Sequence, residues 1–313
     1  VQARALPPAI AGRDLRASSH TGSGKTAAFA LPALERALAA RAQRAPRRNG
    51  PRVLVLAPTR ELVQQVADAA AGYGRHVPGL RIATVVGGVP YGAQLRALRG
   101  PLDLLVATPG RLMDLMGSGR APLDTVELLV LDEADRMLDM GFIDDIHHIA
   151  AQLPAARQTL MFSATFGGRV GALADELLRD DARTIAVASH TERHATIEQR
   201  LHWADDARHR DALLDHILAD SEVDQALVFT STQRDADWLA DRLADLGHPV
   251  ASLHGGMPQA RRNRVLQGLR NRRLRVLVAT DVAARGIDVP SISHVVNYGL
   301  PLKAEDYVHQ IGR

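Results

Sequence analysis

Short runs of aliphatic residues recur along the chain, and longer stretches with an apolar residue at every third or fourth position separate them. A run of four to six aliphatic residues without alternation is typical of a parallel strand that is covered on both faces. Such runs are RVLVLAPT, RIATVVGG, LDLLVATP, VELLVLDEAD, QTLMFSAT, QALVFTST, PVASLHGG, RVLVATD and SHVVNYGLP. Between them, amphipathic stretches such as ELVQQVADAAAGYG and RDADWLADRLADLG predict helices, the latter ending on the C-cap-like Gly247. The pattern predicts an α/β fold with parallel sheets.

The pattern is interrupted near residues 188–197, where a polar stretch follows a strand-like AVA. We interpret residues 191–196 as a linker between two α/β domains, residues 1–190 and 197–313. His190 and His194 have the spacing of a metal-binding pair, but no glutamate follows the first histidine as the HExxH motif requires. Solvated linker histidines are therefore the simpler interpretation.

Composition narrows the class of protein without identifying it. Of the 313 residues, 46% are hydrophobic and 23% charged, which is ordinary for a soluble globular chain. No apolar run approaches the roughly 18 residues of a membrane span, no signal-like segment opens the chain, and the absence of cysteine excludes disulfides and thiolate metal sites. We therefore expect a cytoplasmic protein. Because the chain opens at Val1 and stops within an apolar and aromatic run, we also expect it to be part of a longer protein.

The charged residues are unusual in one respect, which is the scarcity of lysine. The net charge is +3, and lysine occurs only as Lys25 and Lys303, so the other cations are arginines. Codon bias in a GC-rich genome explains the arginines, and at this net charge composition does not establish nucleic-acid binding.

A glycine-rich stretch precedes the helical pattern AAFALPALERALAA. Its members, which would together cradle a phosphate, are Thr21, Gly22, Ser23, Gly24, Lys25 and Thr26. Glycines let backbone N–H groups wrap a phosphate, the helix N-terminus adds a favourable dipole, and the lysine and threonine supply a cation and a magnesium ligand. The strict GxxxxGK[ST] pattern fails at one position, where Ser19 replaces glycine, and a chance glycine-rich helix start is the alternative. A lysine at this position in so lysine-poor a chain argues against chance.

Acids follow another predicted strand. The apolar run 126–131 ends in Asp132, Glu133 and Asp135, at the strand's carboxyl end, where open α/β sheets bind ligands. Asp132 would hold Mg²⁺ with Thr26, and Glu133 would orient or deprotonate the attacking water. Helix capping at the surface is the alternative for the acids alone, but it loses weight beside the glycine-rich stretch.

Together these motifs resemble the DEAD-box family of ATP-dependent RNA helicases, and DRMLDMGF and ATDVAARGIDV are similar to bacterial members of the RhlE type. The resemblance covers the whole chain. It implies two RecA-like parallel-sheet domains flanking a cleft, the second truncated at its C-terminus, with ATP and RNA each bound across both.

The resemblance also implies roles for individual residues. Adenine would be read by Gln2, the ribose by Asp288 and the γ-phosphate by Arg313, which would also be catalytic with Lys25, Asp132 and Glu133. Nucleotide state would be coupled to RNA by Asp135, Ser163, Thr165, Arg285 and His309. The RNA backbone would be gripped by Thr59, Arg60, Gly88, Thr108, Arg111, Phe229, Arg262 and Thr280.

Two departures from the family pattern concern the chemistry. Gln310 in DYVHQIGR replaces an arginine, and the final arginine of the motif would lie beyond Arg313. We therefore expect this stretch of chain to bind ATP but to hydrolyse it slowly. His20 replaces the glutamine more usual before the phosphate cradle, with no consequence that the sequence reveals.

The predicted function is an ATP-dependent RNA helicase that remodels RNA–protein complexes, acts as a monomer with ATP and Mg²⁺, and contacts RNA without base specificity. Two alternatives stay open: a DNA-acting superfamily 2 helicase, which shares the cradle and the acids, and an ATP-gated RNA clamp without turnover, suggested by Gln310. Ribosome-assembly and RNA-decay partners are equally compatible with the sequence, and a membrane partner is not expected.

Overall fold

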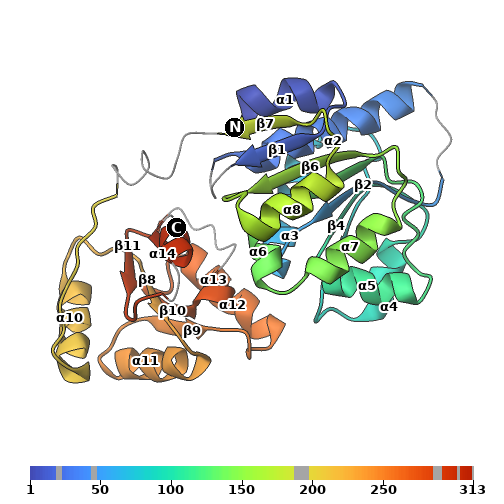
Figure 1. The fold of residues 1–313 in the computed structure, drawn as a ribbon. Helices are drawn as coiled ribbons and strands as arrows, with labels where there is room; N and C mark the ends of the chain where they lie inside the picture. Colours follow the sequence, from blue (N-terminus) through green and yellow to red (C-terminus); the bar gives the residue numbers. More distant parts are fainter. Residues whose placement is uncertain (19–22, 44–47, 187–196, 285–290, 302–303, 312–313) are drawn as a thin grey trace. The chain divides into compact units, whose positions relative to one another are not determined.

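The computed structural model describes residues 1–18, 23–43, 48–186, 197–284, 291–301 and 304–311 (Figure 1). The chain separates into two compact units, Val1–Ser189 and His190–Arg313, and each is considered by itself. The predicted linker 191–196 lies outside the described residues, as do His190, which precedes it, and His194, which lies within it.

The first unit is built on a seven-stranded sheet in the order β3-β4-β2-β5-β6-β1-β7, with every pair of neighbours parallel. Its strands are β1 (Leu15–Ser18), β2 (Gly50–Leu56), β3 (Ile82–Val85), β4 (Pro101–Ala107), β5 (Leu128–Leu131), β6 (Gln158–Ser163) and β7 (Arg183–Ala186). The five aliphatic runs assigned to this part of the sequence form β2 to β6. The hydrophobic pattern missed β1, because only Leu15 and Ala17 of its four residues are apolar.

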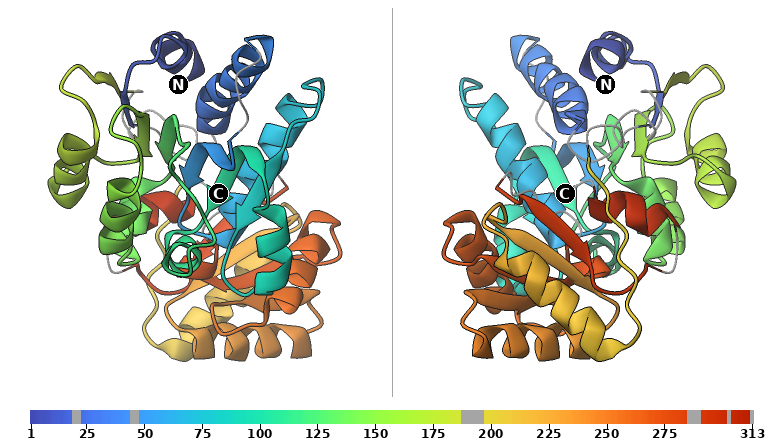
Figure 2. Two further views of the ribbon diagram at one scale, coloured as in Figure 1. Left: turned by 90° about the vertical axis from the view of Figure 1, so that its right-hand side faces the viewer. Right: turned by 90° about the vertical axis from the view of Figure 1, so that its left-hand side faces the viewer.

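Helices cover both faces of this sheet (Figure 2). They are α1 (Gln2–Ile10), α2 (Lys25–Ala42), α3 (Arg60–Tyr73), α4 (Tyr91–Ala97), α5 (Pro109–Gly117), α6 (Ala134–Asp139), α7 (Ile143–Ala151) and α8 (Gly168–Leu177). Successive residues of a strand point to opposite faces. Val53 and Val55 accordingly pack with α1, α2 and α3, whereas Leu54 and Leu56 pack with α5 to α8. Burial on both faces explains why these strands read as unbroken aliphatic runs.

The second unit repeats the plan on a smaller scale. Its parallel sheet has the order β11-β8-β10-β9, formed by β8 (Ala226–Thr230), β9 (Val250–Leu253), β10 (Val276–Thr280) and β11 (His294–Asn297). The helices are α10 (Ala207–Ala219), α11 (Gln233–Asp245), α12 (Gln259–Arg270), α13 (Asp281–Ala284) and α14 (Ala304–Ile311). As the sequence indicated, α11 is followed by Gly247, whose φ of 87° is the left-handed conformation that ends many helices. The predicted α/β fold with two parallel sheets is confirmed.

Within the described parts of the chain, no helix combines the length and the apolar character that crossing a bilayer requires.

The core of the first unit generates a stability prediction. Phe162 on β6 is fully buried, and its ring centroid lies 5.5 Å from that of Phe29 on α2. Phe162→Ala should lower the free energy of unfolding of this unit by about 3–5 kcal/mol, because it removes buried area and leaves a cavity. Native-state hydrogen exchange of the β1 and β6 amides measures the loss. Leu38→Ala, on the same helix as Phe29 but 45% exposed, is the control and should change it by no more than about 0.5 kcal/mol; equal losses in the two variants would contradict the assignment.

Candidate functional site

The carboxyl end of β5 carries two acids near the centre of the first unit's sheet, since β5 lies between β2 and β6. The N–H of Asp132 donates to Leu56 O at 2.9 Å, and the Asp132 side chain is fully buried. Glu133 then turns the chain into α6 with φ 55° and ψ 53°, a left-handed conformation that is uncommon outside glycine. Strained backbone conformations of this kind are frequent at functional sites, so this turn is a candidate site.

Lys25 reaches these acids from a different element. It is the first residue of α2 and follows Gly24, whose φ of 79° turns the chain into the helix. Its Nζ donates to Glu133 Oε1 at 3.2 Å and lies 3.2 Å from Asp132 Oδ1, an ion pair without hydrogen-bond geometry. The lysine is buried as well. Two predicted motifs, separated by more than one hundred residues of sequence, are thus brought into direct contact.

Burial and the opposite charges of neighbouring groups shift the pKa values of Lys25 and Asp132 in opposite directions. Burial alone would lower the pKa of the Lys25 ammonium, but Asp132 and Glu133 outweigh burial and raise that pKa above its usual value. Burial raises the pKa of the Asp132 carboxyl, Lys25 opposes that change, and Glu133 adds to it. The buried Lys25 ammonium is therefore shared by two buried carboxylates.

The cluster can accept a magnesium ion. Among the described residues, Asp132 Oδ2 is buried without a hydrogen-bond partner, and no group of three or more His, Cys, Asp or Glu side chains forms a metal cage in those parts of the chain. Mg²⁺ usually takes one or two carboxylates together with waters and substrate phosphates, so an orphaned carboxylate oxygen fits it and a full cage is not needed. Thr26, the second predicted ligand, is the second residue of α2, next to Lys25.

Gln2 lies against the turn that precedes α2. Its Nε2 donates to Gly24 O at 3.3 Å, and a Cβ at Gly24 would fall 2.5 Å from that nitrogen. The predicted adenine-reading residue is therefore placed beside the described end of the glycine-rich stretch, which includes Ser23 and Gly24. Residues 19–22 lie outside the described residues, so Thr21 and Gly22 are not placed.

Ser163 links the acidic turn to the next strand. It is the last residue of β6, and its Oγ accepts from Asp135 N at 3.3 Å and donates to Thr165 O at 2.6 Å. This single hydroxyl joins the first turn of α6 to the loop after β6. The three residues predicted to couple the two functions of this unit are thus connected to one another.

The predicted RNA contacts of the first unit lie at the same sheet edge. Leu56, Val85 and Ala107, the last residues of β2, β3 and β4, are in register across the sheet. Thr59 accepts from Leu62 N at 3.2 Å as the N-cap of α3, and Thr108 precedes α5 and is buried. Parallel strands aligned in this way bring loops that are distant in sequence to one edge.

Arg60 and Gly88 are in contact across this edge. Gly88 has φ 74°, and a Cβ there would fall 2.2 Å from Arg60 Nη1; at Gly87 it would fall 3.2 Å from Arg60 Nη2. The Arg60 guanidinium therefore packs directly against the two glycines. A side chain at Gly88 would collide with it.

Gln94 is a functional candidate that the sequence did not reveal. It is buried on α4, accepts from Val86 N at 2.9 Å and donates to Val89 O at 3.0 Å, and so holds both ends of the glycine loop. Arg111 donates to the same Val89 O at 2.9 Å and stacks on Tyr91, 4.4 Å from the ring centroid. The only available signal was a glutamine three residues after a tyrosine, which is too common to single out.

In the second unit, the predicted contacts again follow strand ends. Phe229 is the penultimate residue of β8, and Thr230 and Thr280 end β8 and β10 in register with each other. Arg262 on α12 is buried and donates to His254 O at 3.1 Å, so its guanidinium is partly engaged in holding the loop after β9.

Gln310, the residue that departs from the family pattern, is buried on α14 and donates through Nε2 to Asp281 Oδ1, directly after β10. Its Oε1 has no hydrogen-bond partner among the described residues. The Gln310 amide thus ties α14 to Asp281, the residue that follows β10. Arg285, Asp288 and Arg313 lie outside the described residues, as does the side chain of His309.

These features define a class of protein. A lysine at the start of a helix, after a left-handed glycine, faces acids at the end of a neighbouring parallel strand, as in the α/β proteins that bind nucleoside triphosphates.

Comparison with known proteins narrows the class. A family model described as DEAD/DEAH box helicase matches residues 1–172, and one described as helicase conserved C-terminal domain matches residues 208–313. The chain is 44% identical to the ATP-dependent RNA helicase SrmB of Escherichia coli, of which it covers 70%, and 40% identical to the RNA helicase CrhR of Synechocystis, of which it covers 62%; both matches include 100% of this chain.

Solved structures of similar proteins point to the same family. Saccharomyces cerevisiae Dbp5 bound to RNA and ADP BeF3 matches 100% of this chain with a TM-score of 0.86 and 31% identity, over 79% of its own chain. A DEAD box protein from Methanococcus jannaschii matches 99% of this chain with a TM-score of 0.54 and 35% identity, over 81% of its own. The chain therefore belongs to the DEAD/DEAH box helicase family, and the predicted RecA-like architecture and ATP-dependent RNA helicase activity are confirmed. The roles of individual residues stay predictions.

The contact between Gln2 and Gly24 can be tested with a matched pair of variants. Gly24→Ala and Gly141→Ala each place a side chain at a left-handed position, φ 79° and 84°, and each should cost about 1–2 kcal/mol of stability. Only at Gly24 would the new methyl collide with Gln2, since nothing lies within 4 Å of a Cβ at Gly141. Equilibrium binding should therefore show weaker ATP affinity for Gly24→Ala alone; an equal loss in Gly141→Ala would rule out the local explanation.

Proposed function

We propose that this chain grips RNA under the control of ATP binding and hydrolysis, with ATP held at the carboxyl edge of the first unit's sheet by the residues described above. The observation that supports this most directly is the buried contact of Lys25 with Asp132 and Glu133. A phosphate-binding lysine, a metal-binding acid and a catalytic acid are then within reach of one another before any substrate arrives.

Lys25 exchanges partners when the triphosphate binds. Its ammonium is held by two carboxylates, and a phosphate at the start of α2 offers it a competing anion with more charge and with the helix dipole behind it. Departure of Lys25 would leave Asp132 and Glu133 buried without their cation. Asp132, with Thr26, would hold a Mg²⁺ ion that arrives with the nucleotide, and the ion would supply positive charge to the carboxylates and the phosphates.

Glu133 carries the proton step. Once its Oε1 is free of Lys25, the carboxylate can orient a water and accept its proton. The Glu133 carboxylate lies 3.2 Å from Lys25 Nζ, at the start of the helix where the phosphates would bind. We assign Glu133 as the general base on this ground.

Ser163 transmits the state of the acidic turn. A movement of α6 that follows the release of Lys25 changes the Asp135 N to Ser163 Oγ hydrogen bond, and with it the bond from Ser163 Oγ to Thr165 O. The loop after β6 then responds to the nucleotide. Asp135, Ser163 and Thr165 are coupling residues in this proposal.

The neighbouring part of the same edge would hold RNA. Arg60, Arg111 and the N-terminal turns of α3 and α5 present cations and helix dipoles, which bind phosphates without reading bases. We therefore propose backbone recognition that tolerates any base sequence, by a protein that acts as a monomer in the cytoplasm. The second unit would add Phe229, Arg262 and Thr280.

The roles of Lys25 and Glu133 predict different defects. Lys25→Ala should weaken ATP binding about tenfold or more, because it removes a charged phosphate contact, and should lower stability without nucleotide because two buried carboxylates lose their cation. Glu133→Gln should bind ATP as the wild type does, since a glutamine oxygen still accepts from Lys25, while RNA-stimulated turnover falls about a hundredfold or more. Equilibrium binding and steady-state hydrolysis measure both; near-normal turnover by Glu133→Gln would remove it from the role of base.

The same assays decide between the alternatives. Stimulation of hydrolysis by RNA but not by DNA of the same sequence supports the RNA helicase. Tight RNA binding with a non-hydrolysable ATP analogue but no turnover in the wild-type protein would instead make it an ATP-gated clamp.

The arginines at the RNA edge should govern affinity rather than sequence preference. Arg60→Ala and Arg111→Ala should each weaken binding to single-stranded RNA of any base composition, and should reduce the slope of log affinity against log salt by about one. Arg120→Ala is the matched control, because Arg120 is exposed beyond the other end of α5. Fluorescence anisotropy at several salt concentrations measures the slope. Unchanged slopes for Arg60→Ala and Arg111→Ala, or an equal change for Arg120→Ala, would contradict phosphate contact at this edge.

A further inference from the structure

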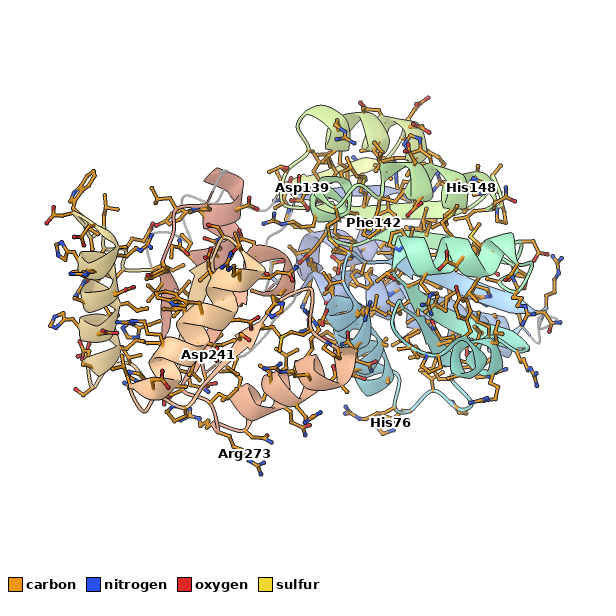
Figure 3. All side chains as sticks on the ribbon, turned by 90° about the horizontal axis from the view of Figure 1, so that it is seen from below. His76, Asp139, Phe142, His148, Asp241 and Arg273 are labelled. Atoms are coloured by element: carbon orange, nitrogen blue, oxygen red, sulfur yellow. The ribbon has the colours of Figure 1, made fainter. Side chains whose placement is uncertain are left out.

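One stripe of α11 presents apolar and acidic side chains to solvent. On its other side, Ala236, Leu239, Ala240 and Leu243 are buried in the core of the second unit. The stripe, here called the α11 outer face, consists of Trp238, Asp241, Arg242, Asp245 and Leu246, spaced as one helical surface row. Trp238 is 50% exposed and Leu246 56% exposed, and Figure 3 shows Asp241 on this helix. A large aromatic residue so open to solvent makes little use of its area in folding.

The α11 outer face is hollowed. A cavity of about 330 Å³ is lined by its five residues. This volume is at the lower end of the range of small-molecule sites, about 300–1,000 Å³. It suits a side chain or two of a partner better than a cofactor.

The charge of the α11 outer face is negative. Asp241 and Asp245 are exposed, and neither has an ion-pair or hydrogen-bond partner within the described residues. Arg242 does not neutralise them, because its Nη1 and Nη2 donate to the two carboxylate oxygens of Asp215 on α10, at 2.9 and 2.5 Å. Both acids also lie in the last two turns of α11, where the helix dipole disfavours negative charge. A bound cation would reduce the repulsion between the two aspartates and their unfavourable interaction with the helix dipole.

Trp238 supplies the aromatic half of a cation site. Elsewhere the chain stacks its own guanidinium groups on aromatic rings, with centroid distances of 4.9 Å for Arg16 on Phe166, 4.4 Å for Arg111 on Tyr91 and 4.2 Å for Arg210 on Tyr298. Among the described side chains no cation lies over Trp238, although the indole face is the strongest acceptor of a cation among the aromatic residues.

We propose that the α11 outer face binds a peptide segment of a partner protein through an arginine, whose guanidinium stacks on Trp238 and pairs with Asp241 or Asp245, while an adjacent aliphatic residue covers Leu246. Arginine fits better than lysine, because a planar guanidinium can stack on a ring and still donate two parallel N–H groups to one carboxylate. RNA does not fit, because unpaired acids repel phosphates. The face is independent of the ATP and RNA sites proposed above, since it shares no residue with them.

The two tryptophans of the chain, Trp203 and Trp238, provide a test with an internal reference. The chain labelled with 5-fluorotryptophan should give two ¹⁹F signals, assigned with Trp203→Phe. The probe is the peptide acetyl-Gly-Ser-Leu-Arg-Gly-Ser-amide, and its matched control carries citrulline, which has the shape of arginine without the charge. We expect the arginine peptide to shift the Trp238 signal in a saturable way and to leave that of Trp203, which is 84% exposed, in place. The citrulline peptide should bind at least about tenfold more weakly, and the lysine peptide should lie between.

Variants locate the contact. Asp241→Asn combined with Asp245→Asn should weaken arginine-peptide binding about tenfold or more, whereas Asp205→Asn, an exposed acid in the segment of Trp203, should leave it unchanged. RNA-stimulated ATPase should stay at the wild-type rate in all of these variants, which also shows that they fold. Equal binding of the citrulline peptide, full affinity in the double variant, or an equal response of Trp203 would overturn the proposal. So would a Trp238 shift caused by RNA, or one caused by raising the protein concentration alone, which would assign the face to a second copy of the chain.

Discussion

The buried contact of Lys25 with Asp132 and Glu133 is the interaction on which the site depends. Two carboxylates and one ammonium have been withdrawn from water, at a cost that their mutual attraction offsets only in part. Asp132 retains a buried oxygen without a partner in the described chain, and its pKa is raised by burial. A buried cluster of this kind adds little to the stability of the fold, which favours a role in binding a ligand. In the proposed function, the buried carboxylate oxygen of Asp132 is the position at which a metal ion accompanying the nucleotide would bind.

The cluster exists because parallel strands end together. β2, β4 and β5 are aligned so that Leu56, Ala107 and Leu131 are neighbours, and each chain segment leaves the sheet at the same edge. The acids after β5, the hydroxyl that ends β6 and the arginines after β2 and β4 thus share one surface. In the proposed function, phosphate chemistry and RNA contact would lie side by side on this scaffold, and Ser163, which is hydrogen-bonded to Asp135 N and Thr165 O, would connect them.

Local sequence predicted most of the fold, but for particular reasons it did not predict all of it. Strands β2, β4, β5, β6, β8 and β10 were visible because residues buried on both faces must be apolar. Strands β3, β9 and β11 are only partly buried, but they too stand out as short aliphatic runs. β1 was invisible because Arg16 occupies a position in which its guanidinium ion-pairs with Asp175 and stacks on Phe166 instead of entering the core. Gln94 was missed because its role comes from two backbone groups of a loop, and backbone groups leave no trace in the sequence.

The sequence by itself predicted the residue types of the candidate site: one of the chain's two lysines after a glycine-rich stretch, acids after an apolar run, and the ordered motifs of the helicase family. It could do so because local backbone requirements, such as left-handed glycines and strand-end acids, restrict the residue type directly. Only the tertiary structure decided which of these groups meet. That Lys25 contacts both acids and that Arg60 lies against Gly88 follow from the register of strands and the packing of helices, which join residues that no local pattern relates. Trp238 and its two aspartates are neighbours by helical spacing alone, but only the packing of α11 leaves that row exposed.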